Sequence, residues 1–342
     1  MTISPAAHSY SDCTARSPLV PNLPKVMIFA LGGTISAHHP DRLDICNYQS
    51  GHYSAADFLA ALPELAELAA IDTLQLSSIS STAIDVADWF DLKQRIEQCL
   101  QTHDAVVITQ GTNTLEETAF FLHLTLNTTK PVIITGAQKP FSALGSDAYF
   151  NLLNSVRTAI SPQAQGHGVL AVANASIYSA RDVSKSKTYA LDAFQAANNG
   201  PIGRIEASGQ VHFMHRSLDA HTANSPFCHI TAPEHTPYIP IIYSHAGADQ
   251  QLIEALLTHT QLDGLVIAGS GAGRCSPLEE QALYKVRARG IPVVMTSRVG
   301  AGGVVDIDCY QALDLLTLGD LSPQKARIYL LLQLINTMQD KS

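Results

Sequence analysis

Residues 25–34 read KVMIFALGGT, an apolar run that ends in two glycines and a threonine. Residues 104–112 (DAVVITQGT) repeat this arrangement, and residues 131–136 (PVIITG) and 168–174 (GVLAVAN) are two further apolar runs that end at a small or polar residue. Continuous apolar runs of this length are typical of parallel strands that are covered on both faces. The first stretch therefore predicts one strand of a parallel α/β sheet, and the other three predict its neighbours.

Amphipathic helices are predicted between these strands. Apolar residues recur at helical spacing in residues 86–100, and Thr114-x-x-Glu117 has the pattern of a capping box that opens the next helix. The alternation restarts near residue 239. Strands are expected at Ile239–Tyr243, Gly264–Ala268 and Ile291–Thr296, and helices at Asp249–Thr258 and from Ser276-Pro277 and Ser322-Pro323, where serine caps and proline starts the helix.

The two series of strands indicate two α/β domains, each with a parallel sheet covered by helices. A turn-rich stretch with little periodicity, residues 212–240, separates them. We therefore expect a flexible leader at 1–23, an N-terminal domain with the active site at 24–214, a linker at 215–238 and a C-terminal domain at 239–342.

The composition argues against several classes of function. The 342 residues hold 21 Lys and Arg against 30 Asp and Glu, a net charge of −9, which does not suit a nucleic-acid-binding surface. No apolar run approaches the roughly 18 residues of a membrane helix. The N-terminus lacks the basic and apolar regions of a signal peptide. We therefore expect a cytoplasmic protein that binds neither nucleic acid nor membranes.

No metal or organic cofactor is predicted. The six cysteines are scattered without a C-x-x-C pair, so neither a zinc site nor a redox dithiol is indicated. His212 and His215 lie in polar sequence without a companion glutamate, and residues 269–273 (GSGAG) lack the spacing of a dinucleotide-binding motif.

The residues after the predicted strands are the best placed for chemistry, because ligands bind beyond the carboxyl ends of parallel strands. Thr34 and Thr112 each follow a glycine there, and Gly136-Ala137 follows a third strand. A glycine lets a backbone N–H approach a reacting carbonyl oxygen, and a neighbouring hydroxyl can attack the carbon. Gly-Thr is also ordinary turn and capping chemistry, so both interpretations stay open on local sequence alone.

Seven collinear blocks resemble the bacterial L-asparaginase/glutaminase family, from about Pro24 to the end of the chain. They are ALGGTIS (30–36), ITQGTNTLEETAFFL (108–122), TGAQKP (135–140), SDAYFNLLNSV (146–156), RDVSKSKTYALDAF (181–194), GPIG (200–203) and TSRVGAGG (296–303). The resemblance implies an asparaginase-like two-domain α/β fold and a cofactor-free amidohydrolase.

The resemblance also implies roles for individual residues. Thr34 would be the nucleophile that attacks a side-chain amide carbon and expels ammonia, and Tyr48, or less favourably Tyr53, would be the lid tyrosine that activates it. Thr112 and Lys185 would activate the attacking water. Backbone N–H groups near Thr112 and Ala137 would stabilise the oxyanion. Ser81 would contact the substrate carboxylate, in a substrate-binding set completed by Thr82, Gly111, Asn113 and Ala137.

Three positions depart from the family pattern. The family aspartate that pairs with the substrate α-ammonium is Asn113 here, a frequent glutamine is Thr82, and Gly247 stands where a partner subunit would supply an asparagine. Losing one charge-assisted contact costs about 1.5–3 kcal/mol. Alternatively Asn113 retains enough hydrogen bonding and another residue, Asp306 or Asp308, compensates.

The leading hypothesis is an L-asparaginase-like amidohydrolase that acts on an asparagine-like carboxamide. Because the family site is built across a subunit pair, a homodimer or a dimer of dimers is expected. One alternative is an amidase, lactamase or esterase for a carboxylate substrate without a free α-amine. The other is a weakly catalytic relative that senses a small acidic metabolite. The sequence leaves open the choice between asparagine and glutamine.

Overall fold

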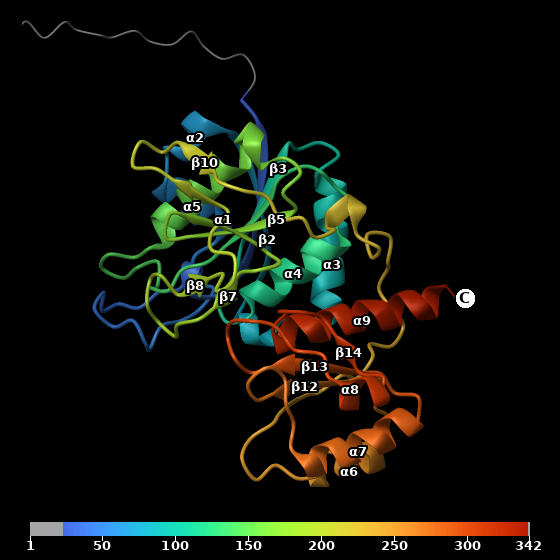
Figure 1. The fold of residues 1–342 in the computed structure, drawn as a ribbon. Helices are drawn as coiled ribbons and strands as arrows, with labels where there is room; N and C mark the ends of the chain where they lie inside the picture. The colour runs from blue at the N-terminus through green and yellow to red at the C-terminus, as the bar shows by residue number, and fades with distance from the viewer. Residues whose placement is uncertain (1–22, 341–342) are drawn as a thin grey trace, which may run out of the picture.

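The computed structural model describes residues 23–340, so Cys13 and all of the predicted leader except Leu23 lie outside the described residues. The two larger sheets, one from each half of the described chain, lie one above the other in Figure 1. The long helix α9 (Pro323–Gln339) runs between them. The two-domain α/β prediction is therefore confirmed.

The N-terminal sheet has eight strands in the order β10-β9-β6-β5-β4-β3-β1-β2. The strands are β1 Lys25–Gly32, β2 Ala70–Ile79, β3 Ala105–Thr109, β4 Val132–Thr135, β5 Val169–Ala173, β6 Ser176–Ser179, β9 Gly203–Ile205 and β10 Val211–Phe213. Strands β1, β3, β4 and β5 are parallel, as predicted, and β2, which was not predicted, joins them in parallel, whereas the pairs β5–β6, β6–β9 and β9–β10 are antiparallel. The sheet is thus mixed, because Asn174 and Ala175 adopt positive φ and turn the chain back within two residues.

Helices cover both faces of this sheet, which explains the unbroken apolar runs of its central strands. Side chains from one face join α3 (Val86–Cys99) and α4 (Leu115–Thr125) in one core cluster. Those from the other face join α1 (Ala55–Ala61), α2 (Leu65–Leu68) and α5 (Ala148–Ala159) in a second cluster.

The capping box predicted at Thr114 is wrong. Thr114 is the residue before α4, but its side chain makes no capping bond; the hydroxyl donates to the carbonyl of Ser81 at 2.7 Å. This bond ties the start of α4 to the neighbouring loop. The helix begins at the predicted position, but the bond to Ser81, and not a capping box, holds its start.

The C-terminal sheet has four parallel strands in the order β11-β12-β13-β14. They are β11 Ile241–Tyr243, β12 Leu265–Gly269, β13 Val293–Ser297 and β14 Leu316–Thr317. Helices α6 (Gln251–His259), α7 (Pro277–Ala288) and α8 (Asp308–Ala312) share a core with this sheet. Both Ser-Pro pairs open helices as predicted, and Ser276 also forms a capping box with Glu279.

Helix α9 contributes to the same hydrophobic cluster as α3 and α4. Ile328, Leu331 and Ile335 of this helix join Val266 and Val294 of the C-terminal sheet in that cluster. Phe227 and Ile230 of the predicted linker are buried there too. The domain limits at 214/215 and 238/239 stay a prediction. None of the helices within residues 23–340 combines the length and apolar character needed to cross a membrane.

Two glycines let the ends of β1 and β3 touch. These strands pair in parallel, with Ala30 opposite Thr109, and the chain continues into Gly33 and Gly111. Gly33 has φ +83°, and a Cβ on it would lie 2.2 Å from the Gly111 Cα. The backbones are therefore closer than any residue with a side chain would permit at Gly33.

We expect Gly33→Ala to lose more stability than a glycine substitution without this contact. Gly166→Ala is the matched control, because Gly166 has φ +71° and nothing lies within 4 Å of its added Cβ. The positive φ costs a residue with a side chain about 1–3 kcal/mol, and the clash adds about 1–3 kcal/mol at Gly33. Urea denaturation of both variants measures the difference; equal losses would contradict the close contact.

A buried histidine lies under β5. His123 on α4 accepts a hydrogen bond from the Val169 N–H at 3.1 Å, and its ring lies 4.8 Å from that of His221. Burial lowers the pKa of His123 well below 6.5, and the positive charges of His221 and Lys325 lower it further. His123 is therefore neutral in the folded protein at neutral pH.

Stability should consequently fall under mild acid. Below pH 6.5 the unfolded chain protonates this histidine while the folded chain does not, so the free energy of unfolding decreases as pH falls, by about 1.4 kcal/mol per pH unit. Urea denaturation at several pH values between 6.5 and about 5 should give a shallower slope for His123→Gln than for wild type. The exposed His235→Gln control should keep the wild-type slope. Identical slopes for wild type and His123→Gln would refute the assignment.

Candidate active site

The two Gly-Thr loops predicted to carry chemistry lie side by side. Thr34 begins a short 3-10 turn directly after β1, and Thr112 lies between β3 and α4. Because Gly33 and Gly111 are in backbone contact, the threonines that follow them emerge from the same edge of the sheet. The carboxyl edge of the parallel strands is thus the candidate site.

Thr34 is hydrogen-bonded to a tyrosine from a separate loop. Its Oγ1 lies 2.8 Å from the Tyr48 hydroxyl oxygen, and either group can donate. The Tyr53 hydroxyl lies instead 2.9 Å from His38 Nδ1. The structure therefore places Tyr48, rather than Tyr53, against Thr34.

The loop that carries Tyr48 is anchored at its base and on its flank. His38 and Gln49 exchange two backbone hydrogen bonds. On the flank, the His39 N–H donates to Ser142 Oγ at 3.0 Å, and the Leu144 N–H donates to the Arg42 carbonyl at 3.0 Å. These contacts hold the Tyr48 hydroxyl over the end of β1.

Lys185 reaches the second threonine from another part of the chain. It belongs to β7 (Ser184–Lys185), which pairs with β8 (Phe194–Gln195). Its Nζ donates to Thr112 Oγ1 at 2.7 Å and to Asn113 Oδ1 at 3.3 Å. Burial lowers the pKa of Lys185 below 10.5, against the opposing effect of the Glu116 carboxylate. The amine is therefore easier to deprotonate than an exposed lysine.

Ser81 lies directly behind the Thr112 loop. It is buried, and its Oγ accepts the Asn113 N–H at 3.2 Å. A Cβ on Gly111 would lie 2.9 Å from that oxygen, so this glycine permits the approach. Thr82, in contrast, is exposed, and its Oγ1 lies 3.0 Å from Ser80 Oγ. The structure therefore brings Ser81, Gly111 and Asn113 together. The Thr82 side chain instead contacts Ser80, two residues earlier in the chain.

The loop after β4 completes the edge of the site. A Cβ on Gly136 would lie 2.6 Å from the Gln110 carbonyl oxygen and 2.8 Å from Thr112 Cγ2. The Asn151 side chain donates to the Gly136 carbonyl at 2.9 Å, which fixes this turn. Ala137 follows in a buried position, next to the Thr112 loop.

Two residues outside the predicted set hold Lys185 in place. Glu116, buried in the first turn of α4, accepts the Lys185 backbone N–H on Oε2 at 2.9 Å. Its Oε1 accepts Gln324 Nε2 at 2.6 Å. The capping-box pattern drew attention to Glu117, one position further on. The sequence signal that could have identified Glu116 is a charged residue on the buried face of an apolar helix.

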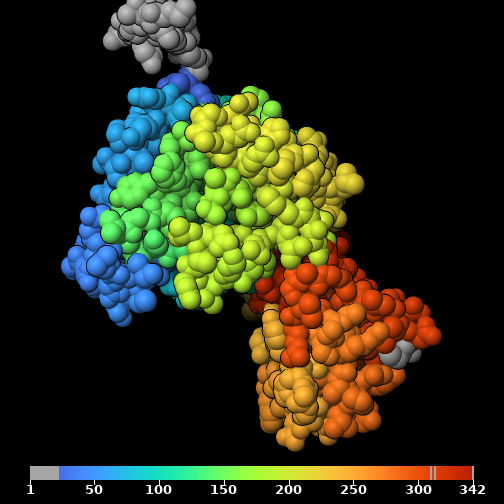
Figure 2. Space-filling model, turned by 60° about the vertical axis from the view of Figure 1, so that its left-hand side comes forward, coloured from blue at the N-terminus to red at the C-terminus, as the bar shows by residue number. Residues whose placement is uncertain are grey.

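A cleft of about 210 Å³ lies between the two domains, and its lining includes Lys185, Arg298, Asp320 and Gln324. Figure 2 shows a notch where the yellow-green surface meets the orange-red C-terminal surface. Thr34 and Thr112 do not line this cleft. Gly247 and Asp306 lie in the C-terminal domain, where Asp306 accepts Gln311 Nε2 at 3.3 Å. Among the described residues, no three His, Cys, Asp or Glu side chains form a metal-binding group.

This arrangement supplies the parts of a covalent hydrolase. A nucleophilic hydroxyl needs a neighbouring group that can take its proton, and the Tyr48 hydroxyl lies within hydrogen-bond distance of Thr34. A second hydroxyl paired with a partly desolvated lysine can orient and deprotonate a water molecule.

Comparisons with known proteins show which family the chain belongs to. Residues 25–219 match the family model described as "Asparaginase, N-terminal", and residues 238–342 match "Glutaminase/Asparaginase C-terminal domain". The chain is 35% identical over 318 residues to L-asparaginase 2 of Bacillus subtilis, covering 92% of this chain and 84% of that protein. It is 33% identical to a glutaminase-asparaginase of Pseudomonas fluorescens, covering 93% and 88%.

A solved structure extends the likeness to three dimensions. The probable cytoplasmic L-asparaginase of Campylobacter jejuni superposes with a TM-score of 0.87 at 33% identity, over 93% of this chain and 98% of that one. The chain therefore belongs to the asparaginase/glutaminase family of hydrolases that act on amide C–N bonds.

Proposed function

We propose that this amidohydrolase cleaves a side-chain carboxamide of an asparagine-like substrate through an acyl-enzyme on Thr34. The observation that carries the proposal is the 2.8 Å hydrogen bond between the Thr34 and Tyr48 hydroxyls at the carboxyl edge of the sheet. The names of the relatives cover both asparagine and glutamine, so the length of the substrate side chain stays open.

In the first half-reaction, Thr34 Oγ1 forms a bond to the amide carbon. Tyr48 takes the threonine proton and gives its own proton to the leaving nitrogen, so ammonia departs and the tyrosine ends as it began. Backbone N–H groups beside Thr112 and Ala137 are the proposed donors to the oxyanion. In the second half-reaction, Thr112 orients a water molecule, and Lys185 removes its proton through Thr112. The water oxygen bonds to the ester carbon, the C–O bond to Thr34 breaks, and Thr34 Oγ1 takes a proton back from Tyr48. The proton held by Lys185 then leaves through water to restore the Tyr48 hydroxyl, and the acid is released.

We expect Thr34→Ala to lower kcat by about 10³-fold or more, as loss of a covalent nucleophile does, with the fold retained. Tyr48→Phe should also lower kcat steeply, because it removes the proton acceptor. Tyr53→Phe is the matched control. It deletes a tyrosine hydroxyl that contacts His38 instead of Thr34, so its kcat should stay close to wild type. Ammonia release from asparagine and glutamine measures all three. Wild-type kcat in Thr34→Ala would refute the acyl-enzyme.

A second candidate is an amide substrate whose α-amine is masked. Lys185 Nζ donates to Asn113 Oδ1, so the Asn113 NH₂ group is left to face outward. An NH₂ group donates hydrogen bonds and cannot accept one from an α-ammonium. It would favour an acyl oxygen at that position, while the hydroxyl of Ser81 is still able to donate to a carboxylate.

Asn113→Asp should therefore raise kcat/KM for free asparagine by about tenfold or more, the value of one charge-assisted hydrogen bond. N-acetylasparagine should gain nothing. Asn127→Asp is the control for the added charge, because Asn127 is exposed at the far end of α4. If wild type hydrolyses asparagine efficiently and Asn113→Asp changes nothing, the masked-amine candidate is wrong. A ligand that binds by calorimetry without turnover would instead favour the sensor alternative. The cytoplasmic location and the homo-oligomer stay predictions.

A further inference from the structure

The first turn of α9 reaches from the C-terminal domain into the N-terminal domain. Lys325 is almost fully buried there, and its Nζ donates to three main-chain carbonyls: Ala180 at 3.0 Å, Arg181 at 2.8 Å and Val183 at 2.5 Å. An ammonium has three protons to donate, so the three carbonyls use its full capacity. Burying a charged group is costly unless it is hydrogen-bonded in this way.

The carbonyls bound by Lys325 belong to the short segment that leads from β6 to Lys185. Val183, the last of the three, lies two residues before Lys185. The segment is tight, because the Val183 N–H donates to the Ser179 carbonyl at 2.9 Å. Lys325 therefore fixes the main chain immediately before the proposed base.

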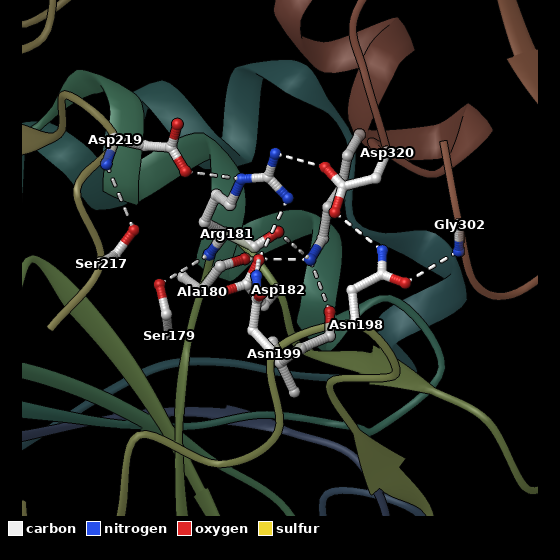
Figure 3. Close-up of polar contacts among 12 residues, drawn as sticks. Ser179, Ala180, Arg181, Asp182, Asn198, Asn199, Ser217, Asp219, Gly302 and Asp320 are labelled. Atoms are coloured by element: carbon white, nitrogen blue, oxygen red, sulfur yellow. Dashed lines mark hydrogen bonds and ion pairs between the residues drawn. The ribbon is translucent and has the colours of Figure 1, made fainter. Parts of the chain in front are cut away.

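A side-chain clamp holds the same segment from the cleft side. Figure 3 shows the Arg181 guanidinium among the carboxylates of Asp182, Asp219 and Asp320. The N–O distances of the three ion pairs are 3.0, 2.9 and 2.5 Å, respectively. Asp320, three residues before α9, also accepts Asn198 Nδ2 at 2.7 Å. Segments from both domains are thus joined at the base of α9.

Glu116 makes the third link. One oxygen of its carboxylate accepts Gln324 Nε2 at 2.6 Å, and the other accepts the Lys185 N–H at 2.9 Å. Gln324 and Lys325 are adjacent, so two neighbouring residues of α9 act on both sides of the Lys185 main chain.

We propose that Lys325, with Gln324, is a positioning residue that holds Lys185 Nζ on Thr112, so that the C-terminal helix sets the geometry of the water-activating pair. The inference rests on the proposed function, because it assigns Lys185 the role given there. Within residues 23–340, Thr34 and Tyr48 are hydrogen-bonded to each other and not to α9, so substrate binding and attack by Thr34 should depend on Lys325 less than turnover does.

The test compares Lys325→Met with Lys130→Met in the full chain. Lys130 is the matched control, because its Nζ also donates to main-chain carbonyls, Leu100 at 2.6 Å and His103 at 2.8 Å, away from the site. Both variants lose a carbonyl-binding ammonium, so both should lose stability. Only Lys325→Met should lower kcat, by about tenfold or more, with KM within about threefold of wild type.

Reaction with acetic anhydride, followed by mass spectrometry, gives a readout that does not require turnover. In Lys325→Met, the Lys185 amine should be freed from Thr112, and the pH at which it becomes half-reactive should rise toward that of an exposed lysine. Lys130→Met should retain the wild-type profile. If Lys325→Met does not fold, Gln324→Leu decides, with the same direction of change expected at Lys185.

The outcomes separate the two levels of the inference. An unchanged Lys185 profile in folded Lys325→Met, or in Gln324→Leu when Lys325→Met is unfolded, overturns the positioning role. A shifted profile with wild-type kcat supports the link between α9 and Lys185 but overturns the role of Lys185 in the proposed function. A shifted profile together with reduced kcat and a retained KM supports both.

Discussion

The close contact between Gly33 and Gly111 is the constraint on which the candidate site depends. Both glycines follow the ends of adjacent parallel strands, and their backbones meet because Gly33 carries no side chain, while the missing side chain of Gly111 makes room for Ser81. Thr34 and Thr112 are consequently presented from one edge of the sheet. Tyr48 and Lys185 then approach these threonines from separate loops, and each makes one short hydrogen bond.

The central part of the fold was predictable because its strands are covered on both faces. A strand such as β3 must be apolar at every position, and this leaves a run in the sequence that few other structures share. The edge strand β2 leaves no such run, since its residues are mostly half-buried or exposed. The short strands β6 and β9 depend on a reversal at Asn174 and Ala175, and alanine is a residue type that seldom adopts positive φ.

The candidate site also has a part that could be predicted from the sequence and a part that could not. Thr34 and Thr112 could be singled out as candidates from the sequence, because each follows a glycine at the end of a predicted buried strand. Tyr48 and Lys185 came from the resemblance to a family, as nothing local distinguishes them from surface residues. Glu116, Gln324 and Lys325 were not found. Each of them acts through a contact with a residue more than 60 positions away in the chain, and such a contact cannot be predicted from the sequence of one helix.

The hydrophobic core that the two domains share around α9 has a consequence for how the protein unfolds. Apolar side chains of this helix fill one cluster together with α4 on one side and the C-terminal sheet on the other. Without the last third of the chain, the N-terminal half would lose part of its hydrophobic core, and α4 would be exposed to water. The two halves are therefore expected to melt as one cooperative unit. A gene encoding residues 24–238 alone would produce a protein prone to aggregation rather than a smaller enzyme.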